Sequence, residues 1–146
     1  MVIIINMKTE APGGIARKYS RKREAILEAI RSTGCHPTAQ WVYERLKPRI
    51  PDLSLGTVYR NIGLFRREGK LASVGVVNGE ERFDGSTGPH PHCVCERCGK
   101  VFDLPCPDEE ALVSLAKSPA GFAADFRKTV FYGVCLECLA AAGKGE

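Results

Sequence analysis

Apolar residues recur at helical spacing in three segments of the first half of the chain. In the last of these segments, Leu55, Val58, Ile62 and Phe65 follow at intervals of 3, 4 and 3 residues, which places them on one buried stripe. Each segment follows a Ser or Thr that can cap a helix and precedes a Gly or Pro that can end one. The expected caps are Ser20, Thr38 and Ser54, and the expected stops are Gly34, Pro48 and Gly69. We therefore predict three short helices.

An alternating stretch from Leu71 to Val77 follows the third helix. The dipeptide Asn78-Gly79 has the sequence of a tight two-residue turn, so we expect residues 82–84 on a returning strand. Three short helices and a two-stranded hairpin are typical of a winged helix, whose third helix enters the major groove of DNA. A lone basic amphipathic helix would be better explained as solvated surface. With the second helix and the hairpin beside it, the pattern favours DNA binding.

The second half of the chain predicts a mixed unit of strands and helices. We expect a strand–knuckle–strand segment over 90–104, a short helix with an acidic first turn over 107–118, an extended segment over 122–134, and a final helix from Cys135. This unit is too small to bury a large core alone, so dimerisation and a structural metal would both stabilise it.

These elements predict an α+β protein with two domains. We expect a winged-helix DNA-binding domain over residues 1–84, in which 1–16 form a loose extension. A hinge of sequence Gly-Ser-Thr-Gly-Pro spans 85–89. A small α/β dimerisation domain with a structural zinc then spans 90–146.

Composition and charge indicate a globular protein and argue against a membrane-spanning or secreted one. The chain has 146 residues, of which 44% are hydrophobic and 26% charged, as in ordinary globular proteins. It has no apolar run long enough to span a membrane and no secretory signal, so we expect a cytoplasmic protein without membrane contact. Residues 1–82 contain 15 Lys and Arg against 8 Asp and Glu, whereas residues 83–146 contain 6 against 9. The basic first half therefore suits a polyanion such as DNA, although a solvated basic face would give the same count.

Four of the seven cysteines form two CxxC pairs, Cys95/Cys98 and Cys135/Cys138. A two-residue gap allows both thiolates of a pair to bind one ion, and two pairs complete a tetrahedral site with no open position. We therefore predict structural Zn(II). A redox dithiol and an iron–sulfur cluster are the alternatives, but the flanking sequence does not resemble a thioredoxin-like unit.

A second constellation involves all three histidines of the chain. His90 and His92 alternate along a predicted strand and would point to one face, whereas His36 precedes the second helix. Asp103 lies on the companion strand, and Asp84 ends the hairpin beside the hinge. A surface His-x-His is by itself a weak metal signal, but two carboxylates flank this one.

Several motifs together resemble the ferric uptake regulator family of dimeric, metal-responsive bacterial transcription regulators. The resemblance covers roughly residues 15–140 and is closest to the peroxide-sensing branch of the family. The motifs that carry it are His36-Pro37-Thr38-Ala39, the run from Ser54 to Asn61, His90-Pro91-His92, Cys95 to Lys100, and Tyr132 to Cys135.

The resemblance implies a regulatory metal site made by His36, Asp84, His90, His92 and Asp103. Three imidazoles and two carboxylates suit Fe(II) or Mn(II) better than an ion that prefers thiolates. In the peroxide-sensing branch, bound Fe(II) reacts with hydrogen peroxide and oxidises ligand histidines, and the matching residues are His36 and His90. An aspartate at position 103 is typical of that branch.

The chain departs from iron-sensing relatives of the family at two positions. Arg127 stands where many have a histidine, and Pro91 stands where many have an acid, which favours one regulatory site per subunit. Cys35 and Cys93 adjoin proposed ligands outside the known pattern, either as inert residues or as thiol targets of an oxidant.

The resemblance also implies double-stranded operator DNA as the partner of a homodimer. Tyr59 and Arg60 are the expected base-reading residues, because arginine pairs with guanine and an aromatic ring packs on the thymine methyl group. The remaining expected DNA contacts are Thr57 and Asn61 on the same helix, and Lys18 and Arg23 near the first helix.

Two other functions fit the sequence less well. The nearer one is an iron- or manganese-responsive repressor that does not sense peroxide. The farther one is an enzyme, which we do not expect because five protein ligands leave little room for a substrate at the metal. Peroxide, as a signal, is then the only small molecule expected to react.

Overall fold

The computed structural model describes residues 20–88, 90–105, 108, 110, 111, 114 and 128–143. Three helices, α1 (Arg21–Arg31), α2 (Ala39–Leu46) and α3 (Leu55–Arg67), precede the hairpin of β1 (Ala72–Val77) and β2 (Glu80–Asp84). A second sheet contains β3 (His92–Cys95), β4 (Val101–Asp103) and β5 (Val130–Gly133), and α5 (Leu136–Ala142) follows it. The α+β class is therefore confirmed. The extension over 1–16, Lys18, Cys106, Arg127 and most of the helix expected over 107–118 lie outside the described residues.

All three predicted N-caps are confirmed. The side chains of Ser20, Thr38 and Ser54 accept hydrogen bonds from the backbone N–H groups at the third position after each cap. Helix α1 ends earlier than expected, at Arg31 rather than near Gly34. The Thr33 hydroxyl accepts a hydrogen bond from the N–H of Cys35, and such a local turn competes with helix continuation.

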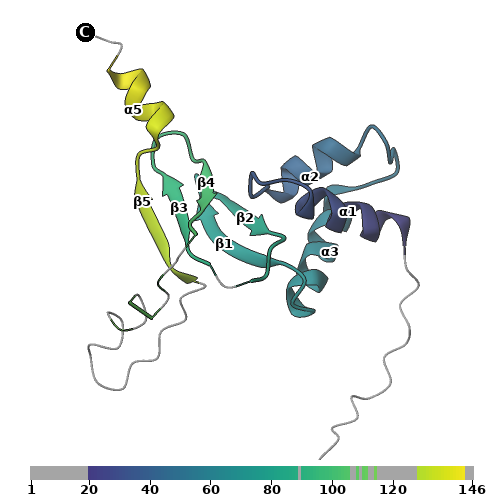
Figure 1. Cartoon of the computed structure of the whole chain (residues 1–146). Coiled ribbons are helices and arrows are strands. Elements are labelled where there is room, and N and C mark those ends of the chain that lie inside the picture. The colour runs from purple at the N-terminus through teal and green to yellow at the C-terminus, as the bar shows by residue number, and fades with distance from the viewer. Residues whose placement is uncertain are drawn as a thin grey trace, which may run out of the picture.

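The predicted hairpin turn is also confirmed. Asn78 and Gly79 both have positive φ angles, 53° and 83°, as a two-residue turn between twisted strands requires. The hairpin lies between the three helices and the second sheet, as Figure 1 shows. Because Phe83 is buried in the helical core and Val77 packs with Val94 and Val101 of the second sheet, the hairpin belongs to both hydrophobic clusters.

The second sheet has the strand order β4-β3-β5, with β4 antiparallel and β5 parallel to β3. His92 lies opposite Asp103 in this sheet. His90, expected on the same strand, precedes it, because Pro91 has no N–H to donate and the ladder starts at His92. Of the segment expected to be extended over 122–134, the structure describes 128–134, and Val130–Gly133 of it form strand β5. None of the helices in the described part of the chain has the length and hydrophobicity to cross a bilayer.

The segment after the hairpin starts in close contact with α1. A Cβ atom added at Gly85 would lie 2.8 Å from Cγ and 2.9 Å from Cα of Arg31, whereas one added at Gly88 would meet no atom within 4 Å. The first residue of the predicted hinge is therefore fixed against the end of α1.

Replacing Gly85 with alanine should destabilise the protein, because the backbone of Arg31 must move to admit a methyl group. We expect Gly85→Ala to lower the free energy of unfolding by about 1–3 kcal/mol, the usual cost of overpacking. The matched variant Gly88→Ala should change it by less than about 0.5 kcal/mol. Urea denaturation followed by circular dichroism measures both, and equal stabilities of the two variants would contradict the contact.

Candidate metal centres and DNA-facing helix

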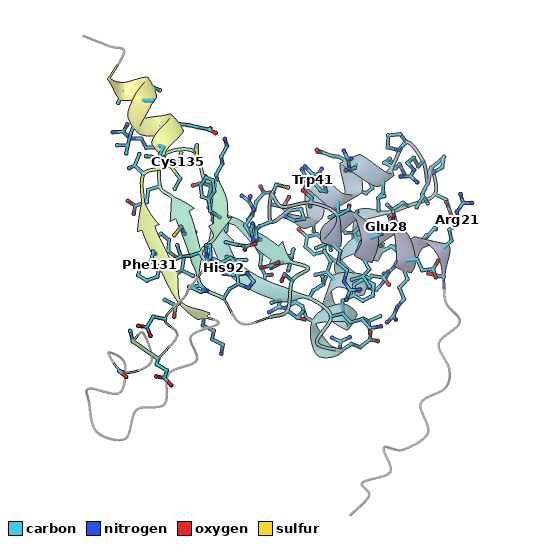
Figure 2. The ribbon with its side chains drawn as sticks, viewed as in Figure 1. Arg21, Glu28, Trp41, His92, Phe131 and Cys135 are labelled. Carbon is cyan, nitrogen blue, oxygen red and sulfur yellow. The ribbon has the colours of Figure 1, made fainter. Side chains whose placement is uncertain are left out.

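The four-residue strand β3 contributes one residue to each of two clusters of metal-binding side chains. His92 starts the strand and Cys95 ends it. At about 3.3 Å per residue, the two positions are about 10 Å apart along the strand. Figure 2 shows His92 beside the hairpin and Cys135 at the other end of the sheet, next to α5. The two sites are therefore separate but share one rigid element.

Cys95, Cys98, Cys135 and Cys138 form the first cluster, with all four sulfur atoms within 4.8 Å of one another. The Sγ atoms of Cys95 and Cys138 are 3.9 Å apart, and those of Cys98 and Cys135 are 3.8 Å apart. Tetrahedral Zn–S bonds of about 2.3 Å would place sulfur atoms about 3.8 Å apart. The spacing of the sulfurs therefore matches a closed tetrahedral site.

The protonation of this cluster also fits a dication. Backbone N–H groups of Cys98 and Cys135 lower the pKa of the Cys95 thiol to about 6. The hydrogen bond with Cys135, together with burial and the other sulfurs, raises the pKa of the Cys138 thiol to about 12. A cation between the sulfurs would favour the thiolate form of both groups, which is how zinc sites bind their metal. The cluster fits structural Zn(II). The two alternatives, a redox dithiol and an iron–sulfur cluster, gain no support from this geometry.

The second cluster joins His36, Asp84, His90, His92 and Asp103, whose ligand atoms also lie within 4.8 Å of one another. Asp84 Oδ2 is 2.8 Å from Nε2 of both His90 and His92. Asp103 Oδ1 is 2.7 Å from Nε2 of His36 and 2.9 Å from Nε2 of His90. The structure thus brings together all five residues that the sequence analysis selected.

These five side chains come from elements far apart in the sequence. His36 lies in the loop between α1 and α2, Asp84 ends β2, and Asp103 ends β4. His36 and Asp84 are buried, with 3% and 6% of their surface exposed. The cluster therefore connects the helical half of the molecule to the second sheet through its most buried polar groups.

Burial and hydrogen bonding act in opposite directions on the charges of this cluster. Burial lowers the pKa of the His36 imidazole, but the carboxylates of Asp84 and Asp103 raise it above its ordinary value. Burial raises the pKa of Asp84, but hydrogen bonds with His36 and His92 keep it well below its usual range. For His90, the Gly88 carbonyl and both aspartates outweigh burial and raise the pKa. The two carboxylates therefore favour positive charge between them.

The orientation of the histidine rings is compatible with a metal ion between the two carboxylates. His90 Nδ1 lies 2.7 Å from the carbonyl oxygen of Gly88, which can only accept a hydrogen bond. Nδ1 therefore carries the proton, and in neutral His90 the Nε2 lone pair points at the two carboxylates. His36 Nδ1 is buried without a hydrogen-bond partner among the residues that the structure describes. Three imidazole nitrogens and two carboxylates fit Fe(II) or Mn(II), with no thiolate in the set.

Arg82 contacts this site although the sequence analysis gave it no role there. Its guanidinium donates hydrogen bonds to the backbone carbonyls of Cys35, His36 and Gly99. Its position two residues before Asp84 was a signal in the sequence. The direction of its side chain depends on long-range packing, which the sequence pattern does not reveal.

Helix α3 presents part of the expected DNA-reading surface to solvent. Tyr59 is 56% exposed, and Arg60 is also exposed. Thr57 and Asn61 are half-buried and make hydrogen bonds within the helix: the Asn61 amide donates to the Thr57 carbonyl at 2.9 Å, and Thr57 Oγ1 lies 2.9 Å from Ser54 Oγ. Tyr59 and Arg60 are therefore the more accessible pair.

Arg23 makes contacts that the sequence analysis did not anticipate. One of its terminal nitrogens donates to both carboxylate oxygens of Glu68, at 2.7 and 2.6 Å, and its guanidinium lies over the ring of Phe65. It thus ties α1 to the end of α3, and its role at DNA stays a prediction that these contacts do not favour.

Cys35 and Cys93 lie outside both clusters. Cys35 is exposed, with its sulfur 3.1 Å from the Thr33 hydroxyl. Cys93 is half-buried on β3, opposite Phe102 in the register with β4.

Comparisons with known proteins agree on one family. The sequence pattern of the ferric uptake regulator family matches residues 15–125. The peroxide operon regulator of Bacillus subtilis is 37% identical over 121 residues, which cover 83% of each protein. The peroxide-responsive repressor PerR of Staphylococcus epidermidis is 34% identical over 121 residues, covering 83% of this chain and 81% of that protein. The crystal structure of the Campylobacter jejuni peroxide stress regulator is 25% identical and covers 80% of this chain and 88% of that one, with a TM-score of 0.67.

Removing one sulfur of the four-cysteine cluster should release its metal. We expect purified protein to contain one zinc ion per chain and Cys98→Ser to lose most of it, because structural zinc needs all four ligands. The matched variant Cys35→Ser changes an exposed cysteine outside the cluster and should retain the metal. Elemental analysis after gel filtration measures both, and full zinc content in Cys98→Ser would argue against the site.

Proposed function

Because the chain belongs to the ferric uptake regulator family, we propose that it is a repressor that senses hydrogen peroxide through oxidation of its own metal-binding histidines. At the level of the family, it is a metal-dependent transcription regulator that binds operator DNA as a dimer, and it is not an enzyme. The observation that carries the finer proposal is the convergence of three imidazoles and two carboxylates on one point. The similarity to two proteins named for their response to peroxide supports it.

The proposed regulatory ligands are His36, Asp84, His90, His92 and Asp103, and the proposed zinc ligands are the four clustered cysteines. When bound at the regulatory site, Fe(II) would reduce hydrogen peroxide next to the imidazoles and direct the addition of an oxygen atom to a histidine ring. Mn(II) would occupy the same ligands without this reaction. The oxidation targets we propose are His36 and His90.

The chain's own residues turn a change at this site into a change of shape. His36 belongs to the helical half, whereas His92 and Asp103 belong to the second sheet. In the intact site they hold the loop before α2 against β3 and β4. Oxidation of His36 removes a nitrogen ligand and weakens that connection, so the two halves can separate about the proposed hinge at 85–89. A metal favours the closed arrangement only through its higher affinity for that arrangement.

The closed arrangement would set the spacing of two recognition helices in a dimer. A palindromic operator requires them about 34–36 Å apart, in successive major grooves. The surface we propose for dimerisation surrounds β5, an edge strand of the described second sheet. Its exposed apolar residues are Phe131 and Tyr132 on β5, Leu136 and Leu139 on α5, and Phe102 on β4 at the other edge of the same sheet. Apolar side chains beside an unpaired strand edge suit pairing with a second copy.

The alternative is a repressor that responds to iron or manganese availability alone. The same ligand set would serve it, because Fe(II) and Mn(II) both accept nitrogen and oxygen donors. The two functions differ in one chemical property, the oxidation of a ligand histidine in the presence of Fe(II).

Peptide mass spectrometry distinguishes these two functions. Protein loaded with Fe(II) and given a modest dose of peroxide should gain one oxygen atom on the peptide containing His36 or His90. Protein loaded with Mn(II) is the control and should stay unmodified. Unmodified histidines in both samples, with metal-dependent operator binding retained, would establish the alternative. Oxidation confined to Cys35 or Cys93 would instead establish a thiol switch.

Arg60→Ala tests the proposed base-reading surface. Loss of an arginine–guanine contact should weaken operator binding by about 1–3 kcal/mol and relax the sequence preference at that base pair. Arg45→Ala is the matched control, because Arg45 belongs to α2, where it lies over the Trp41 ring, and is not part of the proposed reading helix α3. Gel-shift titrations on the operator and on single-base variants provide the measurement. The assignment fails if Arg60→Ala keeps both affinity and sequence preference.

A further inference from the structure

The side chain of Arg82 joins three backbone segments that surround the regulatory site. From strand β2, its guanidinium donates to the Cys35 carbonyl at 2.7 Å, to the His36 carbonyl, and to the Gly99 carbonyl at 3.2 Å. Cys35 and His36 belong to the loop between α1 and α2, and Gly99 belongs to the turn after the first CxxC pair. One side chain therefore connects the hairpin, the His36 loop and the cysteine cluster.

The partners of Arg82 indicate a geometric role rather than a charge-pairing one. Among the residues that the structure describes, no carboxylate forms a salt bridge with it. All three partners are carbonyl oxygens, reached by three different nitrogens of the planar guanidinium. A rigid fork of donors can fix several acceptors at once, whereas a lysine ammonium is a compact point charge.

The backbone that Arg82 contacts is strained at the metal-binding residue itself. His36 has a φ angle of 50°, in the left-handed region that residues other than glycine rarely adopt. Such a conformation persists only where surrounding contacts fix it. Arg82 supplies one contact at the His36 carbonyl, and the N–H of Phe83 supplies another at the Pro37 carbonyl, at 3.0 Å. Both contacts come from the strand that ends at Asp84.

The third partner, Gly99, is fixed on the other side by the cysteine cluster. Its N–H donates to the Cys95 carbonyl at 2.9 Å, and a Cβ atom added there would clash with the side-chain amide of Asn78. The knuckle turn thus provides Arg82 with a rigid anchor.

We propose that Arg82 is a positioning residue for the regulatory metal: it holds His36 in its left-handed conformation and thereby aims Nε2 at Asp84 and Asp103. The inference rests on the proposed function, since it assigns a role toward the ion at that site. Because the same guanidinium donates to the carbonyls of His36 and Gly99, it also connects the His36 loop to the turn that follows Cys98.

The test measures Mn(II) affinity of zinc-loaded protein by competition with a fluorescent chelator. Removing an outer partner of a metal ligand costs about 10- to 100-fold in affinity, and we expect Arg82→Met to lose that much. The direction of the change in Mn(II) affinity is informative, because removing a positive charge near a dication site would by itself strengthen Mn(II) binding. Arg82→Lys keeps the charge but not the fork, and should also bind Mn(II) more weakly. Arg66→Met is the matched control, because Arg66 pairs with Glu81 of the same hairpin and should leave Mn(II) affinity unchanged.

A double-mutant cycle separates positioning from a general loss of structure. If Arg82 acts through His36, Arg82→Met should lower Mn(II) affinity in the original protein but not in a His36→Ala background. Zinc content and the melting temperature without Mn(II) are measured alongside. Equal losses in both backgrounds, or unchanged affinity in Arg82→Met, would overturn the proposal while leaving the regulatory site intact. Failure of the original protein to bind Mn(II), or undiminished binding by His36→Ala, would overturn the proposed site and the role of Arg82 together.

Discussion

The carboxylate of Asp84 lies buried among the imidazoles of three histidines, at the junction of the helical half and the second sheet. A buried carboxylate is costly unless a positive charge or hydrogen-bond donors compensate it. Asp84 ends the strand that also carries Phe83 into the helical core, so it cannot move without disturbing that core. The compensation comes from the imidazoles of His36, His90 and His92, and from the N–H of Ser86, which donates to Asp84 Oδ1 at 2.8 Å. This constraint fixes how the two halves of the molecule meet.

The hairpin and the four-residue strand β3 make this arrangement rigid from both sides. Val77 in the hairpin packs with Val94 and Val101, so the hairpin contacts the second sheet through apolar side chains as well as through the polar cluster. At the far end of β3, Cys95 ties the strand to the cysteine cluster and so to α5. The hairpin and β3 thus form a fixed frame around His36. In the mechanism we propose, loss of one ligand in such a frame would move the two halves relative to each other.

The elements were predictable from the sequence because local interactions determine them. Ser20, Thr38 and Ser54 cap their own helices, and Asn78-Gly79 sets its own turn, so each signal lies within a few residues of its effect. The cysteine cluster could also be selected, because its spacing is restrictive. The five-residue His and Asp set was implied by the resemblance to a family of metal-responsive regulators. The contacts of Arg82 and Arg23 could not be predicted. Each depends on packing between segments about 45 residues apart, which no local pattern encodes.

In the proposed mechanism, the energetic demand on the regulatory site accounts for ligands that come from both halves. Converting a population that is mostly open into one that is mostly closed requires a difference of about 5.5 kcal/mol in binding free energy between the two states. A site contained in one half would bind its ion equally in both states and would shift nothing. His36 is the one imidazole of the cluster from the helical half, so the open state that we propose would lack this ligand and the contacts that position it. The difference in affinity therefore depends on how well His36 is oriented in the closed state, and the strained backbone at this residue is where that orientation is decided.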